Sequence, residues 1–237
     1  MTTASRAERI AFIGWLLLAF VLAWPGNALA ESPTRWNHTA GPPGGMVYTL
    51  VMDPQHPGTL FAGTSNGIYQ STDAGVHWSP IAQAQFACRA VTQLVIDPAD
   101  SRVIYAGTND GLLQSMDGGN SWVSLPLGTT QDVILSLVVH PEHTRLLYVG
   151  AGGTVWRSVD RGAHWQPADE GAPSFAAYCL ALHPWNPNVV YAGADDGIYV
   201  TTDGGGKWHQ TSNGLPTGTQ VQALAIDPRN PLRLYAG

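Results

Sequence analysis

The chain has 237 residues, of which 44% are hydrophobic and only 12% are charged. This hydrophobic share allows a packed core, and the low charge excludes a long charged coiled coil or a polybasic arm. The formal net charge of −6 argues against a nucleic-acid partner, because phosphate binding needs clustered basic side chains.

Residues 1–30 are predicted to be a Sec-type signal peptide. Two arginines precede an apolar run over residues 10–24, and Ala28-Leu29-Ala30 supplies the small-residue cleavage pattern. A membrane span needs about 20 apolar residues, so we expect cleavage after Ala30 rather than an uncleaved anchor. The mature protein, residues 31–237, would then be secreted or periplasmic with no stable membrane anchor.

A unit of 43 or 44 residues repeats four times after this leader. Its most specific part is the segment [ST]-x-D-x-G-x-x-W. The four copies contain Ser71, Asp73, Gly75 and Trp78; Ser115, Asp117, Gly119 and Trp122; Ser158, Asp160, Gly162 and Trp165; and Thr201, Asp203, Gly205 and Trp208. An Asp-Pro or His-Pro pair lies 20 residues before each Asp of these segments, and an aromatic-small-Gly triplet such as Tyr105-Ala106-Gly107 follows each pair.

Each unit divides into four short β segments, here called A to D, bounded by turn signals. In the second unit they are residues 91–96, 103–107, 112–115 and 121–125. Four antiparallel strands in a unit of this length are typical of a β-propeller blade. The sequence therefore predicts an all-β propeller with complete blades at about 46–82, 90–126, 132–168 and 175–212, a partial blade at 219–237 and a lone D strand at 35–39. We expect the blades to belong to a ring of six to eight, or to form a short five-bladed ring.

The Asp segment is expected to close the hairpin between strands C and D. Its carboxylate can accept hydrogen bonds from turn N–H groups, its Gly can adopt positive φ, and its Trp can pack back on the sheet. With these segments the chain resembles the Asp-box (BNR) repeat propellers. Through Gly44-Gly45-Met46-Val47, Asp53-Pro54 and Phe61-Ala62-Gly63-Thr64 it looks closest to the photosystem II stability/assembly factor-like group. Sortilin-type and xyloglucanase-type propellers are more distantly similar, and the resemblance implies that the box is structural.

Binding residues are expected on the D–A loops, which connect strand D of one blade to strand A of the next. The Asp-Pro or His-Pro pair always lies 25 residues before the segment's Trp, whereas the distance from that Trp to the next pair varies from 17 to 19. Variable loops on a rigid scaffold commonly carry ligand contacts. The preferred candidates are Phe86, Arg89, Asp132, Glu170, Phe175, Tyr178 and Gln220, with Gln85, Gln131, Asp169 and Thr219 beside them. The aromatic candidates could instead pack between blades.

Several catalytic and metal motifs are discounted. The stretch Gly63-Thr64-Ser65-Asn66-Gly67 matches G-x-S-x-G, but it lies on a hairpin rather than on the strand-to-helix turn that a nucleophilic serine needs. His140, His143 and His183 belong to repeated turns and lack a further ligand, so neither a metal nor another cofactor is predicted. Whether Cys88 and Cys179 pair is left open.

We predict a non-enzymatic propeller that binds a protein or glycan partner through the D–A loops, as an assembly or stability factor would. The alternative is a fragment of a polysaccharide-acting glycoside hydrolase. Such an enzyme needs two carboxylates across one bond, and Asp132 and Glu170 are the available pair.

Overall fold

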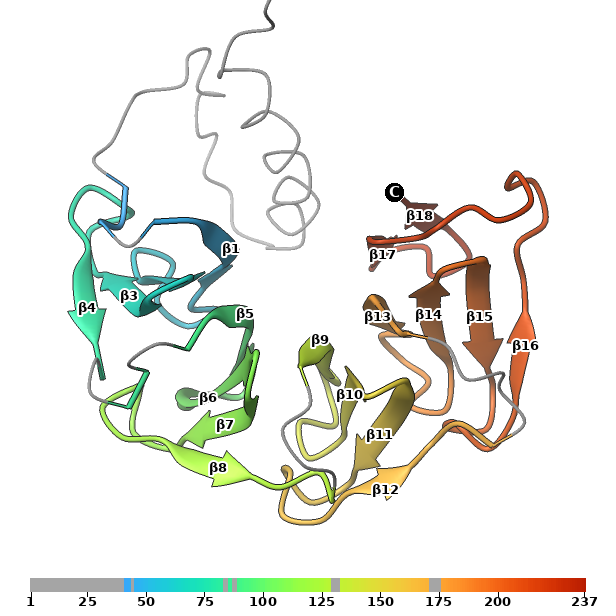
Figure 1. Cartoon of the computed structure of the whole chain (residues 1–237), viewed down its shortest axis with the longest axis horizontal. Coiled ribbons are helices and arrows are strands. Elements are labelled where there is room, and N and C mark those ends of the chain that lie inside the picture. Colours follow the sequence, from blue (N-terminus) through green and yellow to red (C-terminus); the bar gives the residue numbers. More distant parts are fainter. Residues whose placement is uncertain (1–40, 44, 83–84, 87–88, 129–132, 171–175) are drawn as a thin grey trace, which may run out of the picture.

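The structure is a computed structural model that describes residues 41–43, 45–82, 85–86, 89–128, 133–170 and 176–237. These residues form eighteen β-strands and no helix, in five antiparallel sheets (Figure 1). The predicted signal peptide and the lone D strand at 35–39 lie outside the described residues.

Four sheets have four strands each, paired in chain order. The first contains β1 (Val47–Met52), β2 (Leu60–Thr64), β3 (Gly67–Ser71) and β4 (Ser79–Ile81). The second contains β5 (Val91–Asp97), β6 (Asp100–Thr108), β7 (Gly111–Ser115) and β8 (Val123–Leu125). The third contains β9 (Ile134–Val139), β10 (Leu147–Ala151), β11 (Thr154–Ser158) and β12 (Gln166–Pro167). The fourth contains β13 (Cys179–Leu182), β14 (Val190–Ala194), β15 (Gly197–Thr201) and β16 (Trp208–Gln210). The fifth pairs β17 (Leu224–Ile226) with β18 (Leu234–Ala236), so the predicted blade architecture is confirmed.

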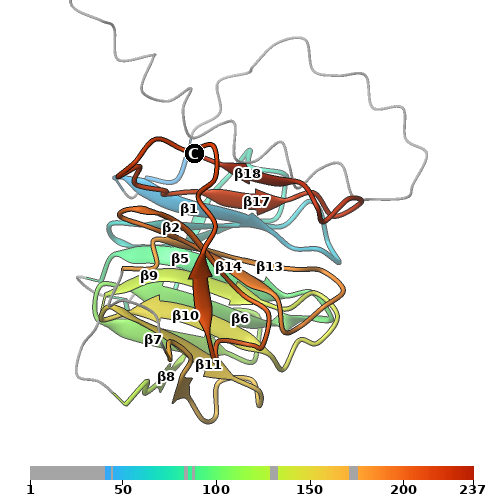
Figure 2. The same ribbon diagram turned by 90° about the vertical axis from the view of Figure 1, so that its right-hand side faces the viewer.

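The sheets follow one another round an arc, with strands β1, β5, β9, β13 and β17 on its inner side (Figure 1). Turned by 90°, the sheets are seen from the side, with β17 and β18 toward the top of the view (Figure 2). In blade terms the inner strand is A and the outer one is D. The core lies between the sheets and consists of buried aliphatic and aromatic side chains.

The glycine of each aromatic-small-Gly triplet sets how closely two blades approach. A Cβ on Gly107 would lie 2.6 Å from Cγ2 of Ile134, which begins the A strand of the next sheet. A Cβ on Gly193 would lie 2.7 Å from the backbone oxygen of Val221. Glycine is needed at these positions because the next inner strand occupies the space of a side chain.

In the second and third sheets, the tyrosine of the triplet joins its blade to the Asp segment of the following one. The hydroxyl of Tyr105 donates to the backbone oxygen of Arg161 at 3.3 Å, and that of Tyr148 donates to the backbone oxygen of Gly204 at 3.1 Å. Burial raises the pKa of Tyr105 to about 12, so this hydroxyl stays a donor. The repeat therefore specifies contacts between blades as well as the strands within them.

The Asp segments form the C–D turns. In the first sheet, Ser71 Oγ donates to Asp73 Oδ1 at 2.8 Å and accepts the Gly75 N–H at 2.9 Å, while Asp73 Oδ1 also accepts the His77 N–H at 2.9 Å. The other three sheets repeat these bonds. Hydrogen bonds from Ser121 lower the pKa of Asp117 to about 2, and those from His164 lower the pKa of Asp160 to about 2. These carboxylates are engaged in turn formation.

Candidate functional site: the D–A face

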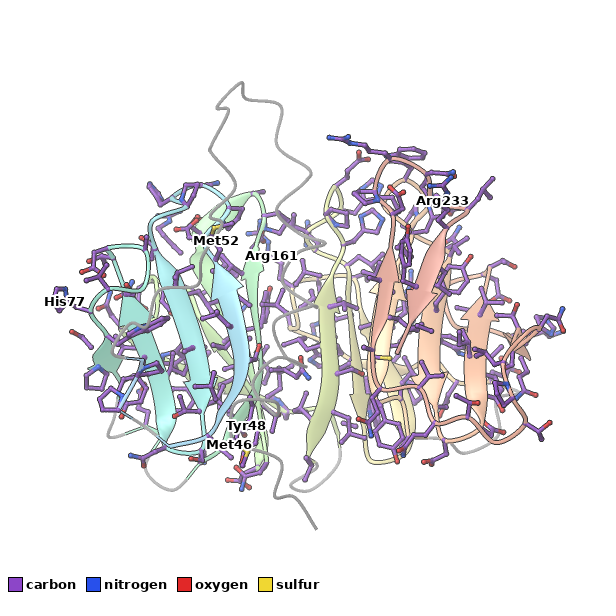
Figure 3. All side chains as sticks on the ribbon, turned by 90° about the horizontal axis from the view of Figure 1, so that it is seen from above. Met46, Tyr48, Met52, His77, Arg161 and Arg233 are labelled. Atoms are coloured by element: carbon purple, nitrogen blue, oxygen red, sulfur yellow. The ribbon has the colours of Figure 1, made fainter. Side chains whose placement is uncertain are left out.

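The arc has two faces, and the loops divide between them. The D–A loops and the B–C turns lie on one face, here called the D–A face. The A–B and C–D turns lie on the other, here called the A–B face. Met46 and Tyr48 lie at the D–A end of the first sheet, whereas Met52, Arg161 and Arg233 lie toward the A–B end (Figure 3).

Two predicted binding residues come together on the D–A face. The hydroxyl of Tyr178 donates to Asp195 Oδ1 at 2.8 Å, and Gln220 Nε2 donates to the same oxygen at 3.0 Å. Gln222 Nε2 extends the network by donating to Gln220 Oε1 at 3.1 Å. The hydrogen bond to Asp195 raises the pKa of Tyr178. Tyr178 is half-buried and the other residues are exposed, so this network joins the fourth and fifth sheets at a solvent-facing surface.

Sequence reasoning missed Asp195, the residue that joins these two candidates. Its place in a B–C turn suggests a turn-forming role, as is common for Asp. The available signal was the Asp195-Asp196 pair itself, because the equivalent turns read Ser-Asn, Asn-Asp and Gly-Gly in the other sheets.

Two further candidates serve the fold. Arg89 Nη2 lies 3.1 Å from Asp110 Oδ2 in the B–C turn of the second sheet, so its charge is paired within the chain. Phe86 is only 1% exposed and packs edge-on against Trp122, with ring centroids 5.3 Å apart. Phe86 is therefore a core residue rather than a binding residue, as the alternative of packing between blades implied.

The acidic candidates for hydrolysis are only partly described. Glu170 is exposed in the loop after β12, and Asp169 beside it is half-buried. Asp132 and Phe175, together with Gln131, lie outside the described residues. The pairing of Asp132 with Glu170 stays a prediction.

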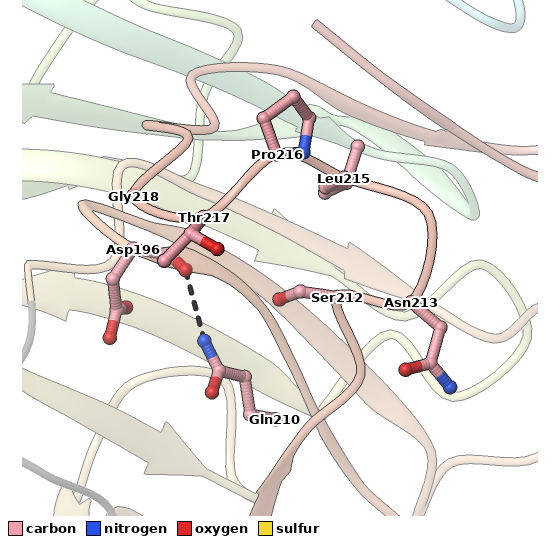
Figure 4. Close-up of a pocket in the computed structure, with 8 residues that line it drawn as sticks. All are labelled: Asp196, Gln210, Ser212, Asn213, Leu215, Pro216, Thr217 and Gly218. Carbon is pink, nitrogen blue, oxygen red and sulfur yellow. Dashed lines mark hydrogen bonds between the residues drawn. The ribbon is translucent and has the colours of Figure 1, made fainter.

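A pocket of about 490 Å³ includes Asp196, the residue that follows Asp195, in its wall (Figure 4). It is lined by Asp196, Gln210, Ser212, Asn213, Leu215, Pro216, Thr217 and Gly218. Gln210 Nε2 donates to the backbone oxygen of Asp196 at 2.9 Å. The hydroxyl of Tyr199 donates to the carboxylate of Asp196, at 3.1 Å from Oδ1 and 3.0 Å from Oδ2. This pocket could not be predicted from the sequence, because a polar loop after a D strand looks like any other.

The histidines that suggested a metal act as turn acceptors. His140 Nδ1 accepts the N–H groups of Glu142 and His143 at 3.2 and 3.0 Å, as Asp53 Oδ1 accepts those of the two equivalent residues in the first sheet. No group of three His, Cys, Asp or Glu side chains suited to a metal occurs among the described residues. Burial raises the pKa of the free thiol of Cys179 to about 12, which makes it a poor nucleophile. Nor does the described part contain a helix that is long and apolar enough to cross a membrane.

Stacked four-stranded sheets with a polar loop face define a β-propeller domain. Residues 26–226 match the family model of the DUF6242 beta propeller domain, and the chain belongs to this family. No curated protein matches the chain.

Three solved propellers are similar in structure. The chain is 25% identical to an ancestral GH74 enzyme, with a TM-score of 0.71 over 81% of this chain and 27% of that one. It is 21% identical to the GH74 xyloglucanase from Xanthomonas campestris, with a TM-score of 0.64 over 82% of this chain and 34% of that one. It is 18% identical to YCF48 bound to D1 peptide, with a TM-score of 0.63 over 86% of this chain and 66% of that one. The chain thus spans about a third or less of the two GH74 enzymes, and similar propellers include both enzymes and a peptide-bound protein.

Proposed function

We propose that this chain is a non-enzymatic, exported propeller domain that binds a protein partner through its D–A face, as an assembly or stability factor would. The observation that carries the proposal is the network in which Tyr178 and Gln220, from two successive D–A loops, bind one oxygen of Asp195. Such a network holds hydrogen-bond donors and acceptors in fixed positions on a loop surface, where they are not needed for pairing between strands.

Two further observations support a protein partner. The carboxylates of the four Asp segments are engaged in turn hydrogen bonds, whereas the D–A loops vary in length from one unit to the next. YCF48, which has a similar fold, was solved with a bound D1 peptide. Export to the periplasm or outside the cell follows from the signal peptide predicted at residues 1–30.

Site-specific photo-crosslinking tests this proposal. The photoreactive residue p-benzoylphenylalanine would replace Tyr178 or Gln220 and, as the matched control on the exposed A–B face, His77, in the organism that carries the gene. We expect protein adducts from positions 178 and 220 and few from position 77. Equal crosslinking at all three positions would contradict a partner surface on the D–A face.

A second candidate function is hydrolysis of a polysaccharide. The similarity to two GH74 enzymes and the exposed carboxylate of Glu170 favour it. A reducing-sugar assay on xyloglucan, β-glucan and sialosides tests it with the variants Asp132→Ala and Glu170→Ala. Turnover that both substitutions abolish would establish the enzyme, whereas our first proposal expects no turnover by the unmodified chain.

A further inference from the structure

The pocket beside the β14–β15 turn has a single charged lining residue. Its wall combines Asp196 with amide and hydroxyl side chains, and with Leu215 and Pro216 from the loop that follows β16 (Figure 4). At about 490 Å³ it lies within the range of about 300–1,000 Å³ that small ligands occupy, and it can hold one long side chain. Its chemistry is thus one negative charge beside a short apolar surface.

The B–C turn of the second sheet is equivalent to this turn, and its aspartate forms an ion pair. Asp110 precedes the glycine that begins β7, as Asp196 precedes the glycine that begins β15. Asp110 Oδ2 lies 3.1 Å from Nη2 of Arg89, which belongs to the preceding D–A loop. Asp196 has no ion pair within the part of the chain that the structure describes. In the second blade a guanidinium therefore binds the aspartate of this turn, whereas in the fourth blade the equivalent aspartate belongs to the wall of a pocket.

Hydrogen bonds hold the pocket wall in place. The hydroxyl of Tyr199 fixes the carboxylate of Asp196, and Gln210 is held by the backbone oxygen of the same residue. The hydroxyl of Tyr199 bridges the two oxygens, at 3.1 and 3.0 Å, so a ligand donor would reach one of the remaining outer lone pairs of the carboxylate. The neighbouring Asp195 adds a second negative charge at the same turn. A ligand here needs little reorganisation of the protein and is favoured if it is cationic.

We infer that this pocket binds an arginine or lysine side chain from an extended segment of the partner protein, so that the partner is basic at its contact with the fourth blade. The cationic head would bind Asp196, as Arg89 binds Asp110, and the aliphatic stem would lie on Leu215 and Pro216. The inference rests on the proposed function and adds the chemical character of the partner to it.

Peptide binding tests the inference directly. The probe is a fluorescein-labelled peptide with four arginines spaced by Gly-Ser pairs, and its control is the same peptide with citrulline, which keeps the shape and loses the charge. Fluorescence anisotropy should show tighter binding of the arginine peptide. Asp196→Asn keeps an acceptor for Tyr199, and it should weaken binding by about tenfold or more, as the loss of one charge-assisted hydrogen bond does.

Asp110→Asn is the matched control, because that carboxylate is already paired with Arg89. It should leave peptide affinity within about twofold of the parent, since Asp110 is half-buried, is already occupied by Arg89 and lies in another blade. Equal affinity for the two peptides, or equal weakening by both substitutions, would overturn the inference. So would Ca²⁺ binding in calorimetry that Asp196→Asn abolishes while neither peptide is preferred.

The outcome separates this inference from the proposed function. Crosslinks at positions 178 and 220 without any arginine preference would keep the partner surface and refute the basic contact. An arginine preference at Asp196 without such crosslinks would keep the basic pocket and refute the wider partner surface.

Discussion

The buried His140 makes the third A–B turn sensitive to acid. Its Nδ1 must be unprotonated to accept the two backbone N–H groups at 3.2 and 3.0 Å. Burial and the neighbouring His143 lower the pKa of His140 below its ordinary value of 6.5. The unfolded chain therefore binds this proton more readily than the native one. The stability from the neutral ring is fully present above pH 6.5 and is lost as the pH falls through the lower native pKa.

The magnitude follows from the two hydrogen bonds. At about 1 kcal/mol each, their loss costs about 2 kcal/mol, and the burial of a charged ring adds to that cost. Proton binding by the unfolded chain, with a pKa of 6.5, limits the part of this cost that appears by pH 5.5 to about 1.4 kcal/mol. A domain of this size changes its melting temperature by about 2–4 °C per kcal/mol, so the expected loss between pH 7.5 and 5.5 is about 3–6 °C. The substitution His140→Asp should remove most of it, because Asp53 and Asp97 already perform the same role in two sheets.

Thermal melts at pH 7.5 and 5.5 check this expectation. The parent chain should lose more melting temperature between the two values than His140→Asp does. An exposed strand residue provides the control, and His209→Gln should retain the parent's dependence. If the parent and His140→Asp lose the same melting temperature, the argument that Nδ1 of His140 holds this turn is refuted.

Four other expectations follow from the packing between blades and from the thiol. Gly107→Ala would bring a Cβ to 2.6 Å from Ile134 and should destabilise the fold by about 1–3 kcal/mol in urea titrations. Gly58→Ala, where the nearest atom is 3.9 Å away, should stay within about 0.5 kcal/mol of the parent. Tyr148→Phe removes the hydroxyl that donates to Gly204 and should cost about 1–2 kcal/mol by the same titration. Cys179, with a thiol pKa raised to about 12, should resist iodoacetamide at pH 8 until guanidinium unfolds the chain, as followed by intact mass.

The repeat made the blades predictable because its spacing is enforced by contacts. Gly107 must lack a side chain for the next A strand to approach, and Tyr105 must reach the following Asp segment. A residue with such a fixed neighbour recurs at a fixed interval. The strand order of four sheets and the pairing in the fifth could therefore be predicted from the sequence.

The site was less predictable because loop residues have no such fixed neighbour. Phe86 and Tyr178 both stand in D–A loops and are both aromatic, yet one is buried against Trp122 and the other donates a hydrogen bond at the surface. Composition does not distinguish these outcomes, since an aromatic ring can pack or bind with equal ease. Asp195 was missed because its turn position suggested a structural role.

The same contrast indicates where selection for binding can act in this fold. Acidic residues in the Asp segments and in the Asp-Pro turns accept backbone hydrogen bonds, so their loss would harm stability before it changed any ligand contact. The B–C turn of the third sheet reads Gly152-Gly153, so the turn itself does not require a carboxylate. Asp195 and Asp196 occupy that permissive position. Both accept side-chain hydrogen bonds in the fourth and fifth sheets, but a neutral amide could accept the same bonds. Their negative charge is therefore better explained by what the D–A face binds than by what the blade needs to fold.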